Sequence, residues 1–515
     1  MAFTMTRRTA LQGALASTTL LAMPALVRAQ SARPVLTHGV QSGDVAHDGA
    51  VLWARADREA RMMVEWATSD SFADAQPVQH LDVGVPTDLT GKMALSGLPS
   101  DQDIFYRVTM LDLADLGAAS EPLVGHFRTA PMSKRDIRFV WSGDTAGQGW
   151  GIDRDRGGMR TYATMLRHAP DFLIHSGDTV YADGPLKAEV ELADGTMWRN
   201  VMTEEKSKVA ETLQEFRGQF LYNLLDDNVR AFNAEVPVLA QWDDHEVTNN
   251  WYPTESLASD DRYTVKSVDL LAARGARAFH EMMPTRQSLE EPNRVYRKVA
   301  YGPMLDIFFL DMRTYRGPNT ANREEGGAPF LGAEQLAWLK RGLTNSTATW
   351  KVIASDMPIG MMVRDGEAAM ENGANGDGPP LGREQDIAEV LSFIKAAEID
   401  NTVWLTADVH YTAAHHYSPD RADFQDFEPF WEFVSGPLHS GSFGPSTYDS
   451  TFGPEVRFAK APTEAQGQNL PPSMGLQFFG LVDIDAATEV MTVRLMDRDD
   501  VELWSTELAP APRRA

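Results

Sequence analysis

Six short apolar runs, each followed within a few residues by an aspartate, constrain the fold of this chain more than any other sequence feature. The runs span residues 137–141, 172–174, 236–240, 305–310, 352–354 and 403–405. Runs this short and this largely apolar, with Arg138 and Asp306 as their charged residues, are typical of strands that are covered on both faces. Helical stretches separate them, at residues 159–168, 265–283, 333–343 and 384–397. The alternation predicts a layered α/β domain.

The aspartates that follow these runs predict a common site. They are Asp144, Asp178, Asp244, Asp311, Asp356 and Asp408, and Asp243 directly precedes Asp244. Ligands of open α/β sheets bind outside the carboxyl ends of the strands, so we expect these carboxylates to converge. Any one of them, taken alone, is also explained as a turn former or a helix N-cap. Six together would repel one another unless cations lay among them, which predicts a metal site.

The segment before these runs has a different pattern. Residues 34–130 contain short alternating runs punctuated by turn residues, which predicts a small β-sandwich domain. The stretch LSGLP at 95–99, followed by FYRV at 105–108, resembles the end of a fibronectin type III module. Pro131 marks the boundary, and residues 136–510, including strands expected within 476–508, form the main domain.

The first 29 residues have the features of a twin-arginine signal peptide. Arg7 and Arg8 precede a soft apolar stretch at 13–27, and residues 27–29 offer a cleavage point. A transmembrane anchor is the alternative, but a span needs about 20 strongly apolar residues, and Ser, Thr and Pro interrupt this shorter stretch. We therefore expect the twin-arginine export machinery as a partner and a periplasmic or secreted mature protein without a membrane span.

Composition narrows the chemistry. The chain of 515 residues has 47 Lys and Arg against 73 Asp and Glu, a net charge of -26, and it has no cysteine. So acidic a protein is not expected to bind nucleic acid or anionic lipid nonspecifically. The missing cysteines exclude disulfides, Cys zinc sites, iron–sulfur clusters and thiol nucleophiles. Phosphate chemistry here would need local cations, and metal ions would supply them.

Four motifs together resemble one known family. GDTVY at 177–181, WDDHEVTNN at 242–250, LDMRTYR at 310–316 and LTADVH at 405–410 correspond to the patterns GDxxY, WDDHExxNN, LDxRxYR and GDVH. In this order they resemble the calcineurin-like metallophosphoesterases, and within them the PhoD-type alkaline phosphatases and phosphodiesterases. The resemblance covers nearly the whole mature chain. It implies a four-layer αββα sandwich preceded by a small all-β, fibronectin III-like domain.

The resemblance also implies a dinuclear or larger metal centre. One ion would be held by Asp144, Asp178, Tyr181 and His410, and the second by Asp178 as a bridge with Asp244, Asp356 and Asp408. PhoD-type enzymes depend on iron and calcium. A phenolate with an imidazole suits Fe³⁺, and hard carboxylate oxygens suit Ca²⁺, Mn²⁺ or Mg²⁺. Asp144 stands where relatives often have Cys, and Asp356 where related phosphatases have His. Both departures replace a softer sulfur or nitrogen ligand with a hard carboxylate oxygen.

The expected activity is hydrolysis of small organic phosphate esters by a metal-activated hydroxide that attacks in line. His245 is predicted to stabilise or protonate the leaving oxygen, and an ordinary structural histidine is the alternative. Asp243 would orient His245 or hold an extra cation. Arg313 is a candidate phosphate clamp, or else it holds Asp311 or a neighbouring loop.

Two other functions remain open on the sequence alone. One is a phosphodiesterase of the phospholipase D type, which the same family scaffold supports. The other is a non-catalytic, calcium-stabilised exported binding module. The long connections at 182–203 and 365–382 are expected to be either functional lids or variable surface loops.

Overall fold

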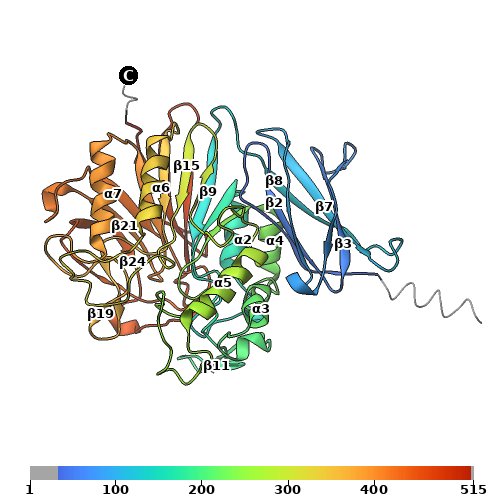
Figure 1. The fold of residues 1–515 in the computed structure, drawn as a ribbon, viewed down its shortest axis with the longest axis horizontal. Helices are drawn as coiled ribbons and strands as arrows, with labels where there is room; N and C mark the ends of the chain where they lie inside the picture. Colours follow the sequence, from blue (N-terminus) through green and yellow to red (C-terminus); the bar gives the residue numbers. More distant parts are fainter. Residues whose placement is uncertain (1–32, 512–515) are drawn as a thin grey trace, which may run out of the picture.

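The structure is a computed structural model that describes residues 33–511. The predicted signal peptide at 1–29 therefore lies outside the described residues. Strands of the N-terminal segment form one end of the molecule, and a larger body of strands and helices makes up the rest (Figure 1). Within residues 33–511, no helix combines the length and apolar character that a bilayer crossing requires.

Two mixed β-sheets form the centre of the larger body. The first has the order β27-β26-β25-β9-β10-β13-β1-β2-β6. The six strands from the β27 edge to β13 are β27 (Glu502–Leu508), β26 (Met491–Asp497), β25 (Phe478–Ile484), β9 (Ile137–Ser142), β10 (Phe172–Ser176) and β13 (Val238–Gln241). The remaining three, β1, β2 and β6, belong to the N-terminal unit described below. The second has the order β14-β15-β16-β20-β22-β21-β24. Its strands are β14 (Arg297–Ala300), β15 (Leu305–Phe309), β16 (Trp350–Ala354), β20 (Thr402–Thr406), β21 (Thr412–Tyr417), β22 (Phe430–Val434) and β24 (Pro454–Lys460).

Side chains of alternate residues in these strands enter different hydrophobic cores. On β15, Ile307 and Phe309 belong to the core between the two sheets, whereas Phe308 packs with the helices outside the second sheet. On β9, Phe139 enters the central core and Val140 the core on the outer face of the first sheet. Both faces of these strands are thus covered along most of their length, which explains the largely apolar runs and confirms the predicted αββα layers.

Six helices form the outer layers in the described part of the chain. The first sheet is covered by α2 (Arg160–Arg167), α3 (Leu213–Asn223), α4 (Asp227–Glu235) and α5 (Val268–Met282), and the second by α6 (Ala333–Thr344) and α7 (Glu384–Ala396). Four of them, α2, α5, α6 and α7, lie in the segments predicted to be helical. No helical pattern in the sequence indicated α3 or α4.

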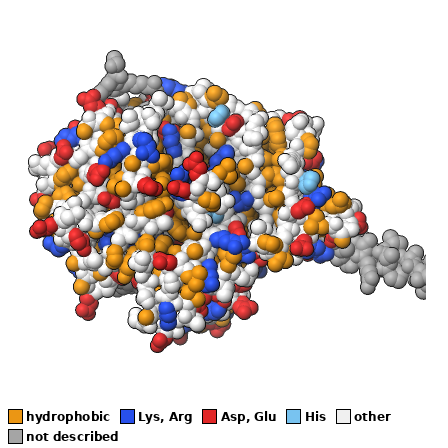
Figure 2. Space-filling model, viewed as in Figure 1, with side chains coloured by type: hydrophobic (Ala, Val, Ile, Leu, Met, Phe, Trp, Pro, Cys, Tyr) orange, Lys and Arg blue, Asp and Glu red, His pale blue; other side chains and the backbone are white. Residues whose placement is uncertain are grey.

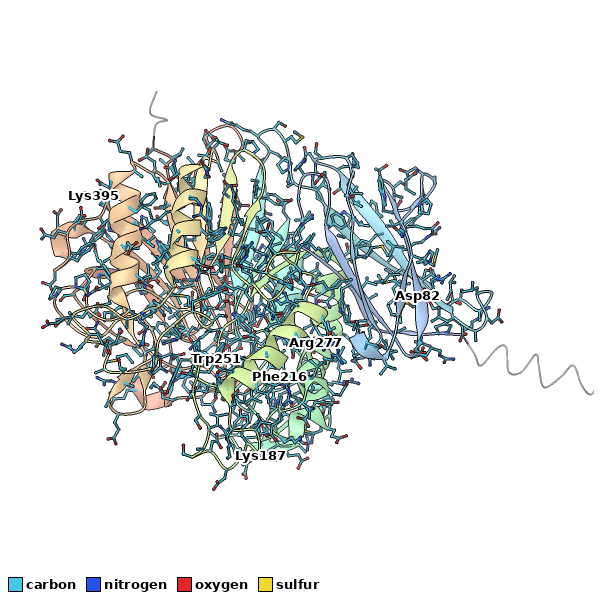
Figure 3. All side chains as sticks on the ribbon, viewed as in Figure 1. Asp82, Lys187, Phe216, Trp251, Arg277 and Lys395 are labelled. Atoms are coloured by element: carbon cyan, nitrogen blue, oxygen red, sulfur yellow. The ribbon has the colours of Figure 1, made fainter. Side chains whose placement is uncertain are left out.

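The composition of α3 explains why it lacks a helical signature. A capping box between Thr212 and Glu215 starts the helix. The helix then buries the polar side chains of Arg217 and Gln219 as well as Phe216, so no clean apolar stripe marks its inner face. Phe216 and Trp251, both labelled in Figure 3, are buried, whereas Arg277 of α5 is exposed.

The N-terminal unit is the small all-β sandwich that the sequence predicts. One of its sheets has the order β4-β3-β7-β8, with β5 beside β3. The strands of the unit are β1 (Leu36–Gly43), β2 (Val51–Ala56), β3 (Ala60–Ala67), β4 (Gln76–Pro77), β5 (Leu81–Val83), β6 (Thr90–Ala94), β7 (Asp103–Asp112) and β8 (Leu123–Arg128). Its other sheet, β1-β2-β6, continues the first sheet of the main body, because β1 runs parallel to β13 and pairs with it at Gly43 and Val238.

Buried polar contacts reinforce this junction. The carboxylate of Asp44 lies 2.7 Å from Nη2 of Arg297 on β14, and the same guanidinium donates to the carbonyl of Ala240. Asp44 is almost fully buried, so the pair must be well satisfied to be tolerated. On β2, the indole of Trp53 donates to the carbonyl of Glu281 on α5.

The two long connections each contain a small hairpin. The first consists of β11 (Glu189–Glu191) and β12 (Met197–Arg199), and the second of β18 (Arg364–Asp365) and β19 (Ala369–Met370). Nearby, β17 (Met361–Met362) pairs with β23 (Thr447–Tyr448). On the face in Figure 2, basic side chains are interspersed with acidic ones.

Candidate metal centre and active site

Five of the six strands that were expected to deliver an aspartate do so at one place. The acids are Asp144 after β9, Asp178 after β10, Asp244 after β13, Asp356 after β16 and Asp408 after β20. The sixth expectation is wrong. Asp311, after β15, accepts hydrogen bonds from the backbone N–H and hydroxyl of Thr314, so its carboxylate closes its own turn.

A first group of ligand atoms comes from three loops. One oxygen each of Asp144 and Asp178 and one ring nitrogen of His410 lie within 4.8 Å of one another. The hydroxyl of Tyr181 is 2.9 Å from Nε2 of His410. Nδ1 of His410 contacts the carbonyl of Gly441, which only accepts, so Nδ1 carries the proton. Nε2 therefore presents its lone pair to the carboxylates, as a metal ligand must.

A second group shares Asp178 with the first. Oxygens of Asp178 and Asp244 lie within 4.8 Å of each other and of a ring nitrogen of His245. Asp178 also accepts a hydrogen bond from the backbone N–H of His245 at 3.2 Å. Asp178 is thus the residue common to both groups, which is the position that a bridging ligand would occupy.

Several carboxylate oxygens of the site are buried without a hydrogen-bond partner in the described chain. They are Oδ2 of Asp144, Oδ2 of Asp243, both oxygens of Asp356 and Oδ2 of Asp408. Buried carboxylates without donors are costly unless a cation compensates them. Because the donors are hard oxygens with one imidazole and one phenol, the residues fit metal ions of the oxygen-preferring kind.

The pKa values of the candidate ligand residues also indicate that cations belong at this site. Burial and the neighbouring Asp243 raise the pKa of Asp144 well above its usual value, and burial and Asp244 do the same to the pKa of Asp178. Burial and Asp243 likewise raise the pKa of Asp356. Burial and nearby acids also raise the pKa of Tyr181. Each of these groups would ionise readily only beside a cation.

Four candidate ligand residues at the strand ends share a strained, left-handed backbone conformation. Asp144, Asp178, Asp408 and His410 all have positive φ angles, of 66°, 49°, 64° and 58°. Asp and His tolerate this region better than most residues, and such outliers gather at functional sites. Gly177 has a φ of 90°, and a Cβ there would lie 2.5 Å from Cβ of Asp243. The tight approach of these two loops therefore requires glycine at 177.

His245 is held by an acid that the sequence analysis did not single out. Nδ1 of His245 lies 2.6 Å from the carboxylate of Asp183, whose other oxygen accepts from the backbone N–H of Asn249. Nε2 points toward Asp244, 4.0 Å away. Burial lowers the pKa of His245, but Asp183 and Asp244 outweigh burial and raise it to about 10. The two neighbouring carboxylates thus favour the protonated form of the ring.

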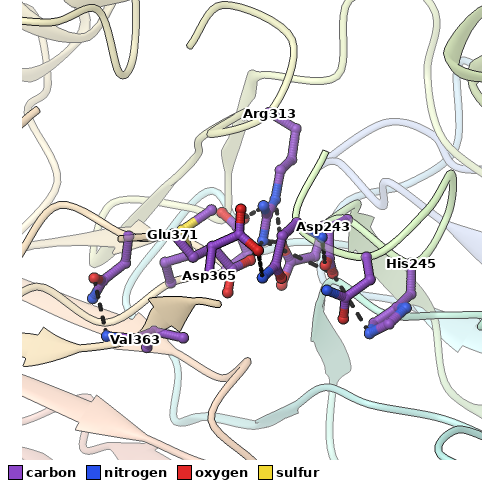
Figure 4. A network of polar contacts seen from close by, with 12 residues as sticks. Asp243, His245, Arg313, Val363, Asp365 and Glu371 are labelled. Carbon is purple, nitrogen blue, oxygen red and sulfur yellow. Dashed lines mark hydrogen bonds and ion pairs between the residues drawn. The ribbon is translucent and has the colours of Figure 1, made fainter. Parts of the chain in front are cut away.

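Arg313 lies beneath the site instead of at its opening. It is fully buried, and its Nε donates to Asp243 at 2.7 Å while Nη2 contacts Glu371 (Figure 4). Asp356 is 3.7 Å from Nε. Arg313 thus compensates the charge of Asp243, and the structure does not place it as the phosphate clamp that the sequence suggested. Asp243, bound to Arg313, does not orient His245 either.

We expect Arg313→Met to destabilise the protein, because it leaves Asp243 and Glu371 buried without their cation. The loss should be about 3–5 kcal/mol in urea unfolding. Arg313→Lys keeps the charge and should lose less. If Arg313→Met instead kept full stability and raised only KM for a phosphate ester, Arg313 would be a substrate clamp.

Three contributors to the site were missed by sequence reasoning. Asp183 follows the GDTVY motif closely, but an acid in a polar loop carries no specific signal. Glu246 accepts from the backbone N–H groups of Thr179 and Asp243 and so joins two site loops. Glu371 reaches Arg313 from the second long connection, and no local pattern marks it.

Known structures agree with this architecture. The chain matches the structure of PhoD with a TM-score of 0.67 and 22% identity, covering 92% of this chain and 89% of that one. It also matches purple acid phosphatase PPD1 from yellow lupin (Lupinus luteus), with a TM-score of 0.54 and 13% identity, over 93% and 74% of the two chains. At these identities the matches show the fold alone. The fold is that of the metallophosphoesterases.

Sequence comparison specifies the family. The family model for PhoD-like phosphatases matches residues 139–495, and the model for the N-terminal domain of PhoD-like phosphatases matches residues 21–131. Alkaline phosphatase D of Bacillus subtilis (strain 168) is 28% identical over 445 residues, which cover 79% of this chain and 70% of that protein. The chain belongs to the PhoD-like phosphatase family and is a phosphoester hydrolase, as the four motifs predicted.

Proposed function

We propose that this chain is an exported, metal-dependent phosphatase that releases phosphate from small organic monoesters. The observation that carries the proposal is the set of buried, unpartnered carboxylate oxygens beside His410 and Tyr181. A phosphate ester carries negative charge, and carboxylates would repel it unless cations intervened. The acidic character of the site is thus itself an argument for metal dependence.

The first proposed ligand set includes the first group of atoms, and the second takes Asp178 and Asp244 from the second group and adds Asp356 and Asp408, whose carboxylates include unpartnered oxygens. Asp144, Asp178, Tyr181 and His410 would hold one ion, and Asp178, Asp244, Asp356 and Asp408 the other. Bound cations would supply Lewis acidity, polarising the phosphoryl oxygens and lowering the pKa of an attacking water. We assign Fe³⁺ to the first set, because the raised pKa of Tyr181 would be overcome best by a strongly Lewis-acidic ion. Ca²⁺ suits the second, with Mn²⁺ or Mg²⁺ as alternatives.

The remaining residues would act on the leaving group and on the ligands. Nε2 of His245 would give its proton to the leaving oxygen, and Asp183 would hold the Nδ1 proton so that the ring keeps one orientation. Arg313 would compensate the charge of Asp243 beneath the ligand Asp244. Asn249 and Asn250 line the pocket, and Nδ2 of Asn250 donates to Asp365.

The experiment that tests the proposal compares p-nitrophenyl phosphate with bis-p-nitrophenyl phosphate before and after chelation. We expect faster turnover of the monoester, loss of activity on removal of the metals, and its return when iron and calcium are added back. A large preference for the bis-ester would replace the proposal with a phospholipase D-type phosphodiesterase. Full activity in metal-free protein would contradict metal dependence.

Metal identity and export need measurements of their own. Elemental analysis of protein purified from its own host should find iron and calcium, and a pair of Zn²⁺ ions would contradict our assignment. Export rests on Arg7 and Arg8 with the apolar stretch that follows them. Fractionation of the host cells should place the mature protein in the periplasm or the medium.

A further inference from the structure

The opening to the site carries one residue whose charge contrasts with its surroundings. A pocket of about 390 Å³ leads to the ligand residues. Its acidic lining consists of Asp178, Asp244, Asp365, Glu371 and Asp408. Among the described residues that line it, Arg364 is the one lysine or arginine.

Arg364 is held in place by the hairpin that carries it. Arg364 and Asp365 form β18, which pairs with β19 through the tight turn at Gly366, where φ is 69°. The neighbouring Asp365 accepts from Nδ2 of Asn250 at 3.1 Å and from Nδ2 of Asn319 at 2.9 Å (Figure 4). Asn250 belongs to the WDDHEVTNN motif, so the hairpin is tied directly to the metal-site loops.

The guanidinium of Arg364 has few interaction partners in the described part of the chain. Arg364 is exposed, and within the described residues its one hydrogen bond is a long 3.5 Å contact to the carbonyl of Glu367. No carboxylate of residues 33–511 forms an ion pair with it at 4.0 Å or less. Most arginines near acids in this protein are paired, as Arg313 is with Asp243. An unpaired guanidinium on a fixed hairpin is suited to bind an anion that arrives with the substrate.

We propose that Arg364 forms a subsite for a second anionic group of the substrate. The proposal rests on the proposed function, since the scissile phosphate would occupy the metal centre and the second group would reach the hairpin. The preferred substrates are then phosphate esters whose alcohol portion carries a further phosphate or carboxylate. The pocket also has an apolar wall, formed by Val363, Val409 and Phe443, against which the carbon chain between the two anions would pack.

The test uses two esters that differ by one charge. Glycerol 3-phosphate and 3-phosphoglycerate have the same length, and only the second carries a carboxylate. We expect the unmodified protein to prefer 3-phosphoglycerate. Arg364→Ala should raise KM for 3-phosphoglycerate by about 10- to 100-fold, the effect of one charged hydrogen bond, and change KM for glycerol 3-phosphate by less than about twofold. Arg364→Lys should restore part of the difference.

Two controls keep the result specific. Arg457→Ala removes a similarly exposed arginine that lies outside the pocket lining and should leave both KM values unchanged. Metal content should be the same in all variants. Equal losses for both esters would mean that Arg364 grips the scissile phosphate, and no loss for either would mean that it binds no substrate. Either result would contradict the proposed subsite but leave the proposed function intact. An unmodified protein that hydrolyses no phosphate ester would contradict the proposed function itself.

Discussion

Asp178→Asn is expected to release both metal ions together and to lower phosphate ester hydrolysis by a factor on the order of 1000. Asp178 is the residue that the two groups of ligand atoms share. An amide supplies one neutral oxygen where a carboxylate supplies two charged ones, so the bridge between the ions would be lost. Elemental analysis and turnover of p-nitrophenyl phosphate measure the two effects on the same sample.

The chain offers a matched control for this variant. Asp311 also follows a buried strand and is itself fully buried, but its carboxylate bonds within its own turn. Asp311→Asn should therefore keep both metals and most of the activity. If Asp178→Asn kept one ion at full occupancy, the shared-ligand arrangement would be wrong. If Asp311→Asn also emptied the site, the metal loss would reflect a general loss of structure.

His245→Ala should lower kcat by about 100- to 1000-fold for glycerol 3-phosphate, whose alkoxide leaving group needs a proton. The loss for p-nitrophenyl phosphate should be much smaller, because nitrophenolate leaves without one. Asp183→Asn keeps the ring but weakens its support, so we expect a loss of about tenfold or slightly more for the alkyl ester. The kcat values of the two esters, measured for each variant, provide the comparison.

This comparison also separates two roles that the geometry allows. A ring nitrogen of His245 lies within 4.8 Å of oxygens of Asp178 and Asp244, a spacing that a metal ligand would share. A proton donor leaves the metal content unchanged when removed and shows its effect mainly on poor leaving groups. Equal losses for both esters, together with loss of an ion, would identify His245 as a ligand.

Periodicity in the sequence was sufficient to predict the layers and the gathering of aspartates at the strand ends. The runs at 137–141 and 403–405 are apolar because both faces of β9 and β20 are covered, and the loops after parallel strands meet at one edge. Asp311 shows the limit of this rule. Its strand belongs to the same sheet as β16, but Thr314 offers the carboxylate local donors, and local hydrogen bonds decided its role.

Residues that act through long-range contacts could not be found this way. Asp183 meets His245 across 62 positions, and Glu371 meets Arg313 across 58. Neither pairing leaves a local trace, because both acids lie in irregular connections whose path depends on the completed fold. For Arg313 the sequence left open a phosphate clamp or a role in holding a neighbouring loop, and the contacts with Asp243 and Glu371 agree with the second. An arginine in a phosphatase motif suggests a phosphate clamp, but the two acids that surround it are visible only in three dimensions.

The continuity of the first sheet has a consequence for when the site can form. Its central strand β9 pairs with β10 on one side and with β25, more than 330 residues later, on the other. Gln477, just before β25, also holds the loop at Ser440 that leads to the carbonyl facing His410. The ribosome must therefore finish almost the entire chain before the ligands gather. Such distant pairings slow folding, which would favour a route that delivers the protein across a membrane only after its folding is complete.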